Sequence, residues 1–451
     1  FVARDQAERE RTMVRLLLVC VLLSITICCA HGSFRVVQTI QGGNGDPVYG
    51  DLFGVPLDID AEGNLFVGAL YADGELFPNG TAMERAGKTF FYKKEGETYR
   101  LSEVYTGQSA YNQNSGTSLR AGITSTRLRG TTEWLFDPEA GTPLNVSDPD
   151  VKDRSGNINV FKRQGNAWVI HQRIPNPDGH GPDQNHEEYG INIDFTESGG
   201  GWLVVGGGIT NKAWFVTYDE ETDQWVNTQN VITGALKGNL IVAIGGEYAF
   251  IQVATDFSTI SNLEVLVYKR HGSRWEYHQT LNGIGNTGPN MSFIGDLFGS
   301  PMTIDGSNAV IGAPGDSQAN PGGYNLPGAS YFLRLKNGWW TITDKVFSDQ
   351  PTLFFGFGNC MDGDTAVIAD TGRTVNGNPF QGGLRLYHRH GGRWVPGELL
   401  VDPDGRAFDY FSVCSIGGSS LAGASFRAAT QFLGAGIGES LPGRVVVWDW
   451  D

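Results

Sequence analysis

Short runs of alternating apolar and polar residues recur along the chain, and turns rich in Gly or Asp separate them. The most regular element pairs an aromatic strand with a second strand that opens on Trp or Tyr. Alternation with a period of two residues around a short turn predicts a β-hairpin. Six copies are found, at 90–99, 160–168, 214–225, 267–275, 331–340 and 386–394.

A second kind of strand precedes most of these hairpins. It is a short run of β-branched and small residues, bounded by Gly or Asp, and a run of this length predicts a buried strand rather than a helix. Five such runs are found, at 202–206, 249–253, 309–313, 366–369 and 420–424. After residue 30 no stretch has a comparably clear helical period, so the pattern predicts an all-β protein.

The strands belong to a longer repeat. The plainest copy reads Gly-Asp-Leu-Phe-Gly at 295–299 and Ala-Val-Ile-Gly-Ala-Pro at 309–314, and an earlier copy occupies 50–54 and 65–69. Inner strands are expected to begin near Phe53, Ser118, Tyr189, Gly238, Phe298, Phe357 and Phe411. These positions define seven units of about 60 residues each, a period typical of repeat architectures.

The two ends of the chain complete one another. The last unit stops after the strand at 444–448, and the strand that it lacks is found at 34–40, which matches the outer strand at 275–281. We therefore predict a single domain over 33–451, a seven-bladed β-propeller of four-stranded antiparallel blades. Pairing of the N-terminal strand with the C-terminal blade closes the ring.

These motifs resemble the FG-GAP repeats found in the propeller head of integrin alpha chains and in many secreted proteins. The resemblance covers nearly all of 33–451 and implies the propeller fold. It implies no particular activity, because one fold hosts many activities. It also implies calcium in a loop of alternating carboxylates, here Asp58, Asp60 and Glu62. The last acidic ligand of that loop is missing, so the pattern favours a plain β-turn over a calcium site. The turns at 305–308 and 362–364 are shorter and are interpreted as β-turns.

The N-terminal region carries a targeting signal. An apolar run at 16–30 follows Arg15, which indicates a signal peptide over 13–32, with 1–12 as an upstream extension outside the fold. A retained membrane anchor is the alternative, but fifteen apolar residues are fewer than the ~17–25 of a typical span. Because no second apolar stretch of such length follows, we expect a secreted, extracellular protein with no membrane span in its mature chain.

Charge and covalent chemistry narrow the choice of partners. The formal net charge of −16 disfavours nucleic acid and anionic membranes, and it favours cationic partners. Cys360 and Cys414 occupy equivalent places in neighbouring repeats, which predicts a disulfide between blades six and seven; two buried thiols are the alternative. Asn79, Asn145 and Asn290 lie in glycosylation sequons.

Candidate catalytic residues are scarce. We find none of the nucleophile, zinc-protease or phosphate-loop motifs. The segment 178–188 gathers two His and four carboxylates, but its spacing matches no standard metal site and favours a solvated loop. We therefore expect a non-catalytic interaction or structural module that binds protein subunits, matrix or glycans and requires no cofactor. A carbohydrate-active enzyme and a lectin are the alternatives.

Overall fold

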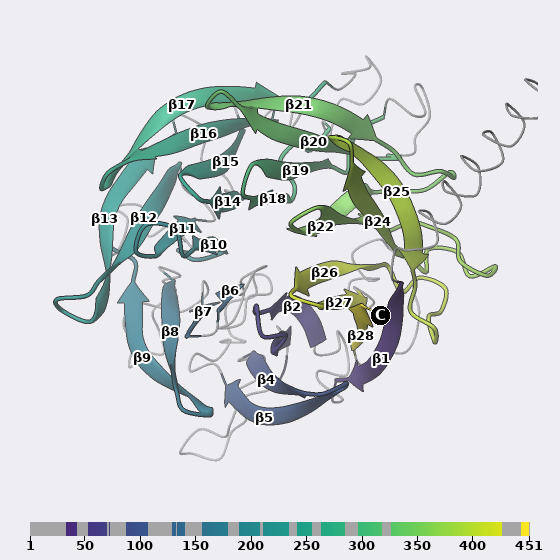
Figure 1. Cartoon of the computed structure of the whole chain (residues 1–451), viewed down its shortest axis with the longest axis horizontal. Coiled ribbons are helices and arrows are strands. Elements are labelled where there is room, and N and C mark those ends of the chain that lie inside the picture. Colours follow the sequence, from purple (N-terminus) through teal and green to yellow (C-terminus); the bar gives the residue numbers. More distant parts are fainter. Residues whose placement is uncertain are drawn as a thin grey trace, which may run out of the picture.

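The computed structural model describes residues 33–42, 53–69, 72, 87–106, 129–131, 133–139, 156–178, 189–207, 211–233, 241–254, 263–284, 296–317, 326–425 and 443–450. Within these residues the chain forms seven four-stranded antiparallel sheets around a common axis, the predicted propeller (Figure 1). The same residues contain no helix of the length and apolar character needed to cross a membrane.

Each blade runs from an inner strand at the axis to an outer strand at the rim. Blade 1 holds β2 (Phe53–Ile59), β3 (Leu65–Ala69), β4 (Lys88–Glu95) and β5 (Thr98–Thr106). Blade 2 holds β6 (Arg129–Gly130), β7 (Trp134–Glu139), β8 (Asn157–Gln164) and β9 (Ala167–Pro175). Blade 3 holds β10 (Asn192–Thr196), β11 (Trp202–Gly206), β12 (Lys212–Asp219) and β13 (Gln224–Ile232). Blade 4 holds β14 (Val242–Gly245), β15 (Tyr248–Ala254), β16 (Leu263–His271) and β17 (Arg274–Asn282).

The remaining three blades follow the same order. Blade 5 holds β18 (Met302–Asp305), β19 (Asn308–Ala313), β20 (Ala329–Lys336) and β21 (Trp339–Val346). Blade 6 holds β22 (Phe355–Asp362), β23 (Thr365–Asp370), β24 (Leu384–His390) and β25 (Arg393–Leu400). Blade 7 holds β26 (Phe411–Gly417), β27 (Ser420–Ser425), β28 (Arg444–Trp450) and, from the other end of the chain, β1 (Phe34–Gln41).

The six predicted hairpins and five predicted middle strands are confirmed, because each coincides with a strand pair or a strand of these blades. Several inner strands differ from the expected starts. Tyr189 lies in a turn three residues before β10, and β22 begins two residues before Phe357. Phe298 lies in a turn, and the inner strand of blade 5 begins four residues later at Met302. In blade 2 the inner strand is Arg129–Gly130, whereas the expected start, Ser118, lies outside the described residues, as does Gly238.

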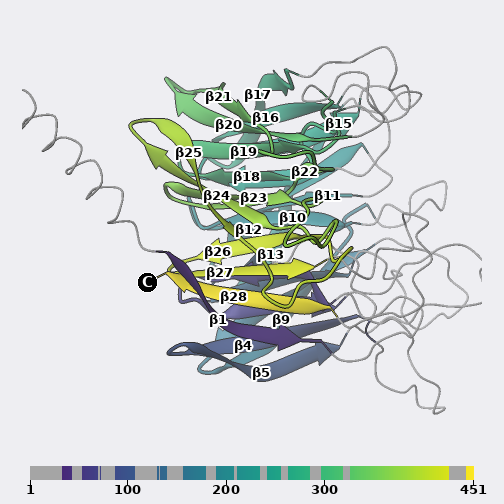
Figure 2. The ribbon, with the colours of Figure 1, turned by 90° about the vertical axis from the view of Figure 1, so that its right-hand side faces the viewer.

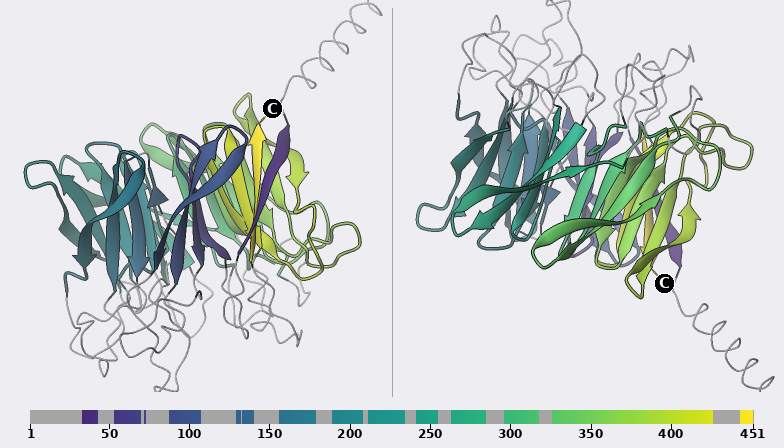
Figure 3. Two further views of the ribbon diagram at one scale, coloured as in Figure 1. Left: turned by 90° about the horizontal axis from the view of Figure 1, so that it is seen from below. Right: turned by 90° about the horizontal axis from the view of Figure 1, so that it is seen from above.

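Closure of the ring by the two ends of the chain is also confirmed. Strand β1 pairs antiparallel with β28, with Phe34 opposite Trp450 and Gln41 opposite Arg444. Figure 3 shows β1 in purple beside β28 in yellow, and Figure 2 gives the same pair from another side. Since β1 is the outermost strand of blade 7, the edge of β28 is paired and blade 7 has four strands like the other blades.

Aromatic side chains fill the space between neighbouring blades, as the pattern predicts. Phe215 of blade 3 stacks on Trp275 of blade 4 at 4.6 Å between ring centroids, and Phe332 of blade 5 stacks on Trp394 of blade 6 at 4.7 Å. Both Trp275 and Phe332 are buried. Burying a side chain of this size stabilises a fold by roughly 1.5–3 kcal/mol, so these contacts hold adjacent sheets face to face.

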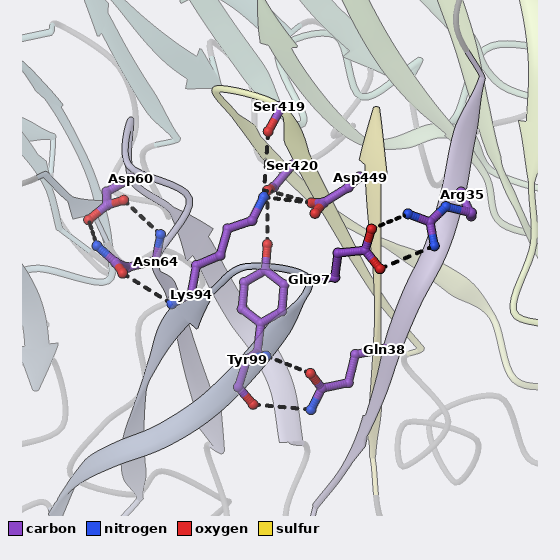
Figure 4. A network of polar contacts seen from close by, with 10 residues as sticks. All are labelled: Arg35, Gln38, Asp60, Asn64, Lys94, Glu97, Tyr99, Ser419, Ser420 and Asp449. Carbon is purple, nitrogen blue, oxygen red and sulfur yellow. Dashed lines mark hydrogen bonds and ion pairs between the residues drawn. The ribbon is translucent and has the colours of Figure 1, made fainter. Parts of the chain in front are cut away.

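A second, polar device joins the outer strands. Gln279 of β17 donates from Nε2 to the Trp340 carbonyl at 3.0 Å, and its Oε1 accepts from the Trp340 N–H at 2.9 Å. Gln229 makes the same two bonds to Trp275, and Gln38 makes them to Tyr99 (Figure 4). In each case the side-chain amide of one outer strand bonds both the N–H and the carbonyl of one residue in the outer strand of the next blade. These two backbone groups thereby gain hydrogen-bond partners across the junction of the blades.

The junction of blades 7 and 1 carries an additional polar cluster that is partly buried (Figure 4). Lys94 of β4 donates to Asp449 of β28 at 2.9 Å and to the Ser420 hydroxyl at 2.8 Å. Tyr99 donates its hydroxyl to Ser420 at 2.9 Å, and Ser420 donates to Asp449 at 2.8 Å. This network ties the first complete blade to the blade that both termini build.

Substitution of Gln279 by Ala tests the polar device. We expect the free energy of unfolding to fall by about 1–3 kcal/mol, because the N–H and carbonyl of the buried Trp340 lose their partner. Urea denaturation measures the change. The control is Gln224→Ala, an exposed Gln that donates to the Asp223 carbonyl, and it should stay within about 0.5 kcal/mol of the parent. Equal losses in the two variants would contradict the proposed role of Gln279.

Candidate functional site

The inner strands enclose a cavity of about 950 Å³ on the axis of the ring. Residues of all seven blades line it, because the first strand of every sheet is the one nearest the axis (Figure 1). Volumes of ~300–1,000 Å³ are typical of small-molecule and peptide-side-chain pockets. We therefore take this cavity as the candidate site.

The two ends of the cavity differ in chemistry. All inner strands run in one direction, so their first residues lie toward one face of the ring and their last residues toward the other. Apolar side chains line the first end, and acidic side chains line the second. The apolar residues are Val55, Leu297, Phe357 and Val413. The acidic residues at the strand ends are Asp60, Glu197, Asp305 and Asp362.

Several of the lining carboxylates join adjacent inner strands. Asp58 of β2 accepts from the Gly130 N–H of blade 2 at 2.9 Å and from the Ser415 hydroxyl of blade 7 at 2.8 Å. Asp194 of β10 accepts from the Ile244 N–H of blade 4 at 2.9 Å. Bonds between a carboxylate and backbone N–H groups are strong, so these side chains also hold the inner strands in register.

Two acidic groups at the mouth have perturbed titration. Burial raises the pKa of Asp362, and the nearby charge of Asp305 raises it further, while the Gly418 N–H lowers it. Burial also raises the pKa of Asp60, which hydrogen bonds from Asn64 oppose. The turns that hold Asp305 and Asp362 form as expected, and Asp305 accepts from the Gly363 N–H of the next blade.

The three carboxylates of the predicted calcium loop face different partners. Asp60 caps its own turn, accepting from the N–H groups of Glu62 at 2.9 Å and Asn64 at 2.8 Å (Figure 4 shows Asp60 with Asn64). Glu62 pairs with Arg163 of blade 2 at 2.8 Å, and that bond lowers the pKa of Glu62. Among the described residues no group of three His, Cys, Asp or Glu is arranged to hold a metal, and calcium stays a prediction.

The two cysteines lie together, as their equivalent positions predict. Cys360 of β22 and Cys414 of β26 form a disulfide with a Cα–Cα distance of 6.0 Å, and both residues line the cavity. The inner strands approach closely here: a Cβ on Gly358 would lie 1.9 Å from the Ser412 carbonyl oxygen, so only Gly fits. The bond therefore links blade 6 to blade 7, the blade that closes the ring.

Other predicted positions lie mostly outside the described residues. These are the sequons at Asn79, Asn145 and Asn290, the signal peptide at 13–32, and most of the segment 178–188. At the start of that segment, Asp178 accepts from Lys212 Nζ at 2.8 Å. This pairing assigns Asp178 a structural role in blade 3.

Sequence reasoning missed two sets of residues that the structure brings together. Asp305 and Asp362 were interpreted only as turn residues and Asp60 as a calcium ligand, although all three recur at the end of inner strands. In each outer strand, the residue four positions after an aromatic residue near the start of the strand is Gln, Glu or Asp; in β21 that aromatic residue is Trp340. These positions are Gln38, Glu103, Gln172, Gln229, Gln279, Asp344 and Glu398. At six junctions the structure shows this side chain bonded to the next blade.

Comparison with known proteins finds structural likeness at low identity. The chain is similar to the Dos1 propeller, with 10% identity, a TM-score of 0.47, and coverage of 92% of this chain and 95% of that one. It is similar to a periplasmic gluconolactonase of Pseudomonas aeruginosa, with 12% identity, a TM-score of 0.44, and coverage of 78% and 86%. It is also similar to a functionally unknown protein of Desulfotomaculum acetoxidans, with 12% identity, a TM-score of 0.46, and coverage of 79% of this chain and 87% of that one.

No family model matches the chain, and no curated protein matches it. The likeness to FG-GAP repeats therefore remains a resemblance of the quoted motifs. Likeness to solved structures at this level bears on neither activity nor ligand.

Proposed function

We propose that the chain is a secreted, non-catalytic binding module, a rigid ring that presents its axial cavity to an extracellular protein partner. The observation that supports the proposal is that carboxylates lining the cavity hold neighbouring blades together. Asp58, Asp194 and Asp305 each accept a hydrogen bond from the backbone of a neighbouring blade, so the cavity wall is a rigid part of the scaffold. A disulfide in the same wall supports both rigidity and an oxidising, extracellular setting.

A specific observation favours a second candidate, a carbohydrate-active enzyme. Glycoside hydrolysis uses two carboxyl groups, one of them with a raised pKa that keeps it protonated as a general acid. Asp362 has a pKa raised by burial and by Asp305, and both residues line the cavity. Against this candidate stands the hydrogen bond that Asp305 accepts from the Gly363 N–H, because it engages the second carboxylate in holding the scaffold.

Turnover measurements separate the two functions. The mature chain is assayed against a panel of chromogenic glycosides and polysaccharides beside the double variant D305N/D362N. The binding-module proposal predicts no turnover above background by either protein. Hydrolysis by the parent that falls about 100-fold or more in the double variant would establish the enzyme instead, since acid–base groups contribute ~10²–10⁴-fold.

A further inference from the structure

The axial cavity is unbalanced in charge. Six acidic residues line it, and the described lining residues include no Lys, Arg or His. The acidic residues are Asp58, Asp60, Asp194, Glu197, Asp305 and Asp362. The formal charge of the wall is therefore strongly negative in a site that is partly shielded from solvent.

Several carboxylates elsewhere in the described part of the ring are paired with cations, and two of them, Asp316 and Asp370, are buried. Asp316 lies 2.7 Å from Lys345, Asp449 lies 2.9 Å from Lys94, and Asp370 lies 2.9 Å from Arg373. Pairing is expected, because a buried charge without a counter-charge is costly. At the cavity mouth, Asp305 accepts from the Gly363 N–H, and Asp305 and Asp362 both line the cavity and are more exposed than Asp316 and Asp370.

The wall between the two ends suits the aliphatic part of a basic side chain. Ile304 and Met361 line the cavity beside the mouth carboxylates, and Phe357 lies at the apolar end with 46% of its surface exposed. Lys and Arg place their methylene stems on apolar surface while their charged heads reach polar groups. A neutral glycan offers no charge complementary to the carboxylates at the mouth, and a folded domain exceeds a cavity of about 950 Å³.

We propose that the axial cavity binds an extended Lys- or Arg-bearing segment of a partner protein, with a basic head group at Asp305 and Asp362. The apolar wall holds the stem of that side chain, and the neighbouring residues of the segment occupy the rest of the cavity. This inference rests on the proposed binding function and adds the chemistry of the partner. The negative net charge of the chain speeds encounter with such a partner.

Isothermal titration calorimetry with hexalysine tests the proposal, with hexaglutamine as the neutral probe. We expect hexalysine to bind the parent protein, and D305N/D362N to weaken binding by at least about tenfold, because two charges at the mouth are removed. The control is Asp364→Asn. Asp364 lies in the same turn as Gly363, is 70% exposed, pairs with Arg389 and does not line the cavity. This control should change the affinity by less than about twofold.

A second variant keeps the test informative if D305N/D362N does not fold. Ala61 is an exposed turn residue at the acidic mouth, and Ala61→Lys adds a competing cation there. It too should weaken hexalysine binding by about tenfold. Equal affinity of parent, D305N/D362N and A61K would overturn the proposal, as would equal binding of hexaglutamine.

Three further outcomes distinguish this inference from its alternatives. Spermine that binds as tightly as hexalysine, with the same loss in D305N/D362N, would overturn the peptide assignment in favour of a small polyamine. Absence of hexalysine binding together with absence of glycoside turnover would overturn only this inference. Glycoside turnover that depends on Asp305 and Asp362 would overturn the proposed function itself.

Discussion

Replacement of Lys345 by Met is expected to lower the free energy of unfolding by about 3–5 kcal/mol. Lys345 of β21 pairs with Asp316 at 2.7 Å, and Asp316 is fully buried. Met fills nearly the same volume but supplies no charge, so the Asp316 carboxylate keeps its desolvation penalty without its counter-ion. The Tyr331 hydroxyl also donates to Asp316, at 3.3 Å, and a neutral donor replaces an ammonium poorly.

The same variant has a predictable pH dependence. Burial raises the pKa of Asp296, the charge of Asp316 raises it further, and Lys345 lowers it. Loss of Lys345 therefore makes the pKa of Asp296 higher in K345M than in the parent protein. A folded-state pKa above the unfolded value contributes stability at acid pH that is lost as the pH rises through the folded value. The difference between parent and K345M should thus be smaller near pH 4 than at pH 7.

Chemical denaturation at both pH values measures this prediction. The matched control is Arg35→Met, which removes a partner of Glu97 from a pair in which both side chains are about half exposed or more. Exposed pairs contribute ~0–1 kcal/mol, so this control should lose little. The double variant K345M/D316N should recover most of the loss, because no charge then remains at position 316. A loss below about 1 kcal/mol in K345M would contradict the argument.

Deletion of β1 is expected to have a larger effect, at least about 5 kcal/mol, which is comparable to the whole stability of many domains. The deletion of 33–41 removes every backbone pair between β1 and β28 and the burial of Phe34 and Ile40. It also removes the bonds from Phe34 to Glu398 and from Gln38 to Tyr99, which join β1 to blades 6 and 1. The remaining edge of β28 is then open to pairing with other chains.

Thermal unfolding and limited proteolysis of the deletion variant measure this effect. Val36→Thr is the control, because Val36 lies in the same strand with 39% of its surface exposed, and it should unfold at nearly the parent temperature. Addition of a synthetic peptide with the sequence of 34–41 should raise the unfolding temperature of the deletion variant. A deletion variant as resistant as the parent would show that closure does not depend on β1.

The repeat and the ring were predictable because their signals are local and recur. Each hairpin is encoded by alternation and a turn within about 20 residues, and seven imperfect copies reinforce one another. The pairing of β1 with β28 was predictable for the same reason, since the strand at 34–40 matches an outer strand that the last repeat lacks. Cys360 and Cys414 followed from the same register.

The hydrogen-bond partner of each polar side chain could not be predicted from the repeat in this way. Asp60 fits a calcium loop by spacing, yet its carboxylate caps a turn through Glu62 and Asn64. The position of Gln279, four residues after Trp275, is evident in the sequence. Its role, however, depends on Trp340, which is 61 residues away in the chain and lies next to it only because the two blades are neighbours. The partner of a polar group is set by what the fold brings within about 3 Å.

The sequence by itself therefore determined the number of blades, their order and the closure of the ring, because backbone pairing follows from periodic local patterns. Only the tertiary structure decided the chemistry of the axis, where Asp58, Asp194, Asp305 and Asp362 converge from separate blades. Their charge balance depends on burial and on neighbours distant in the sequence, and Coulomb energies change steeply with both.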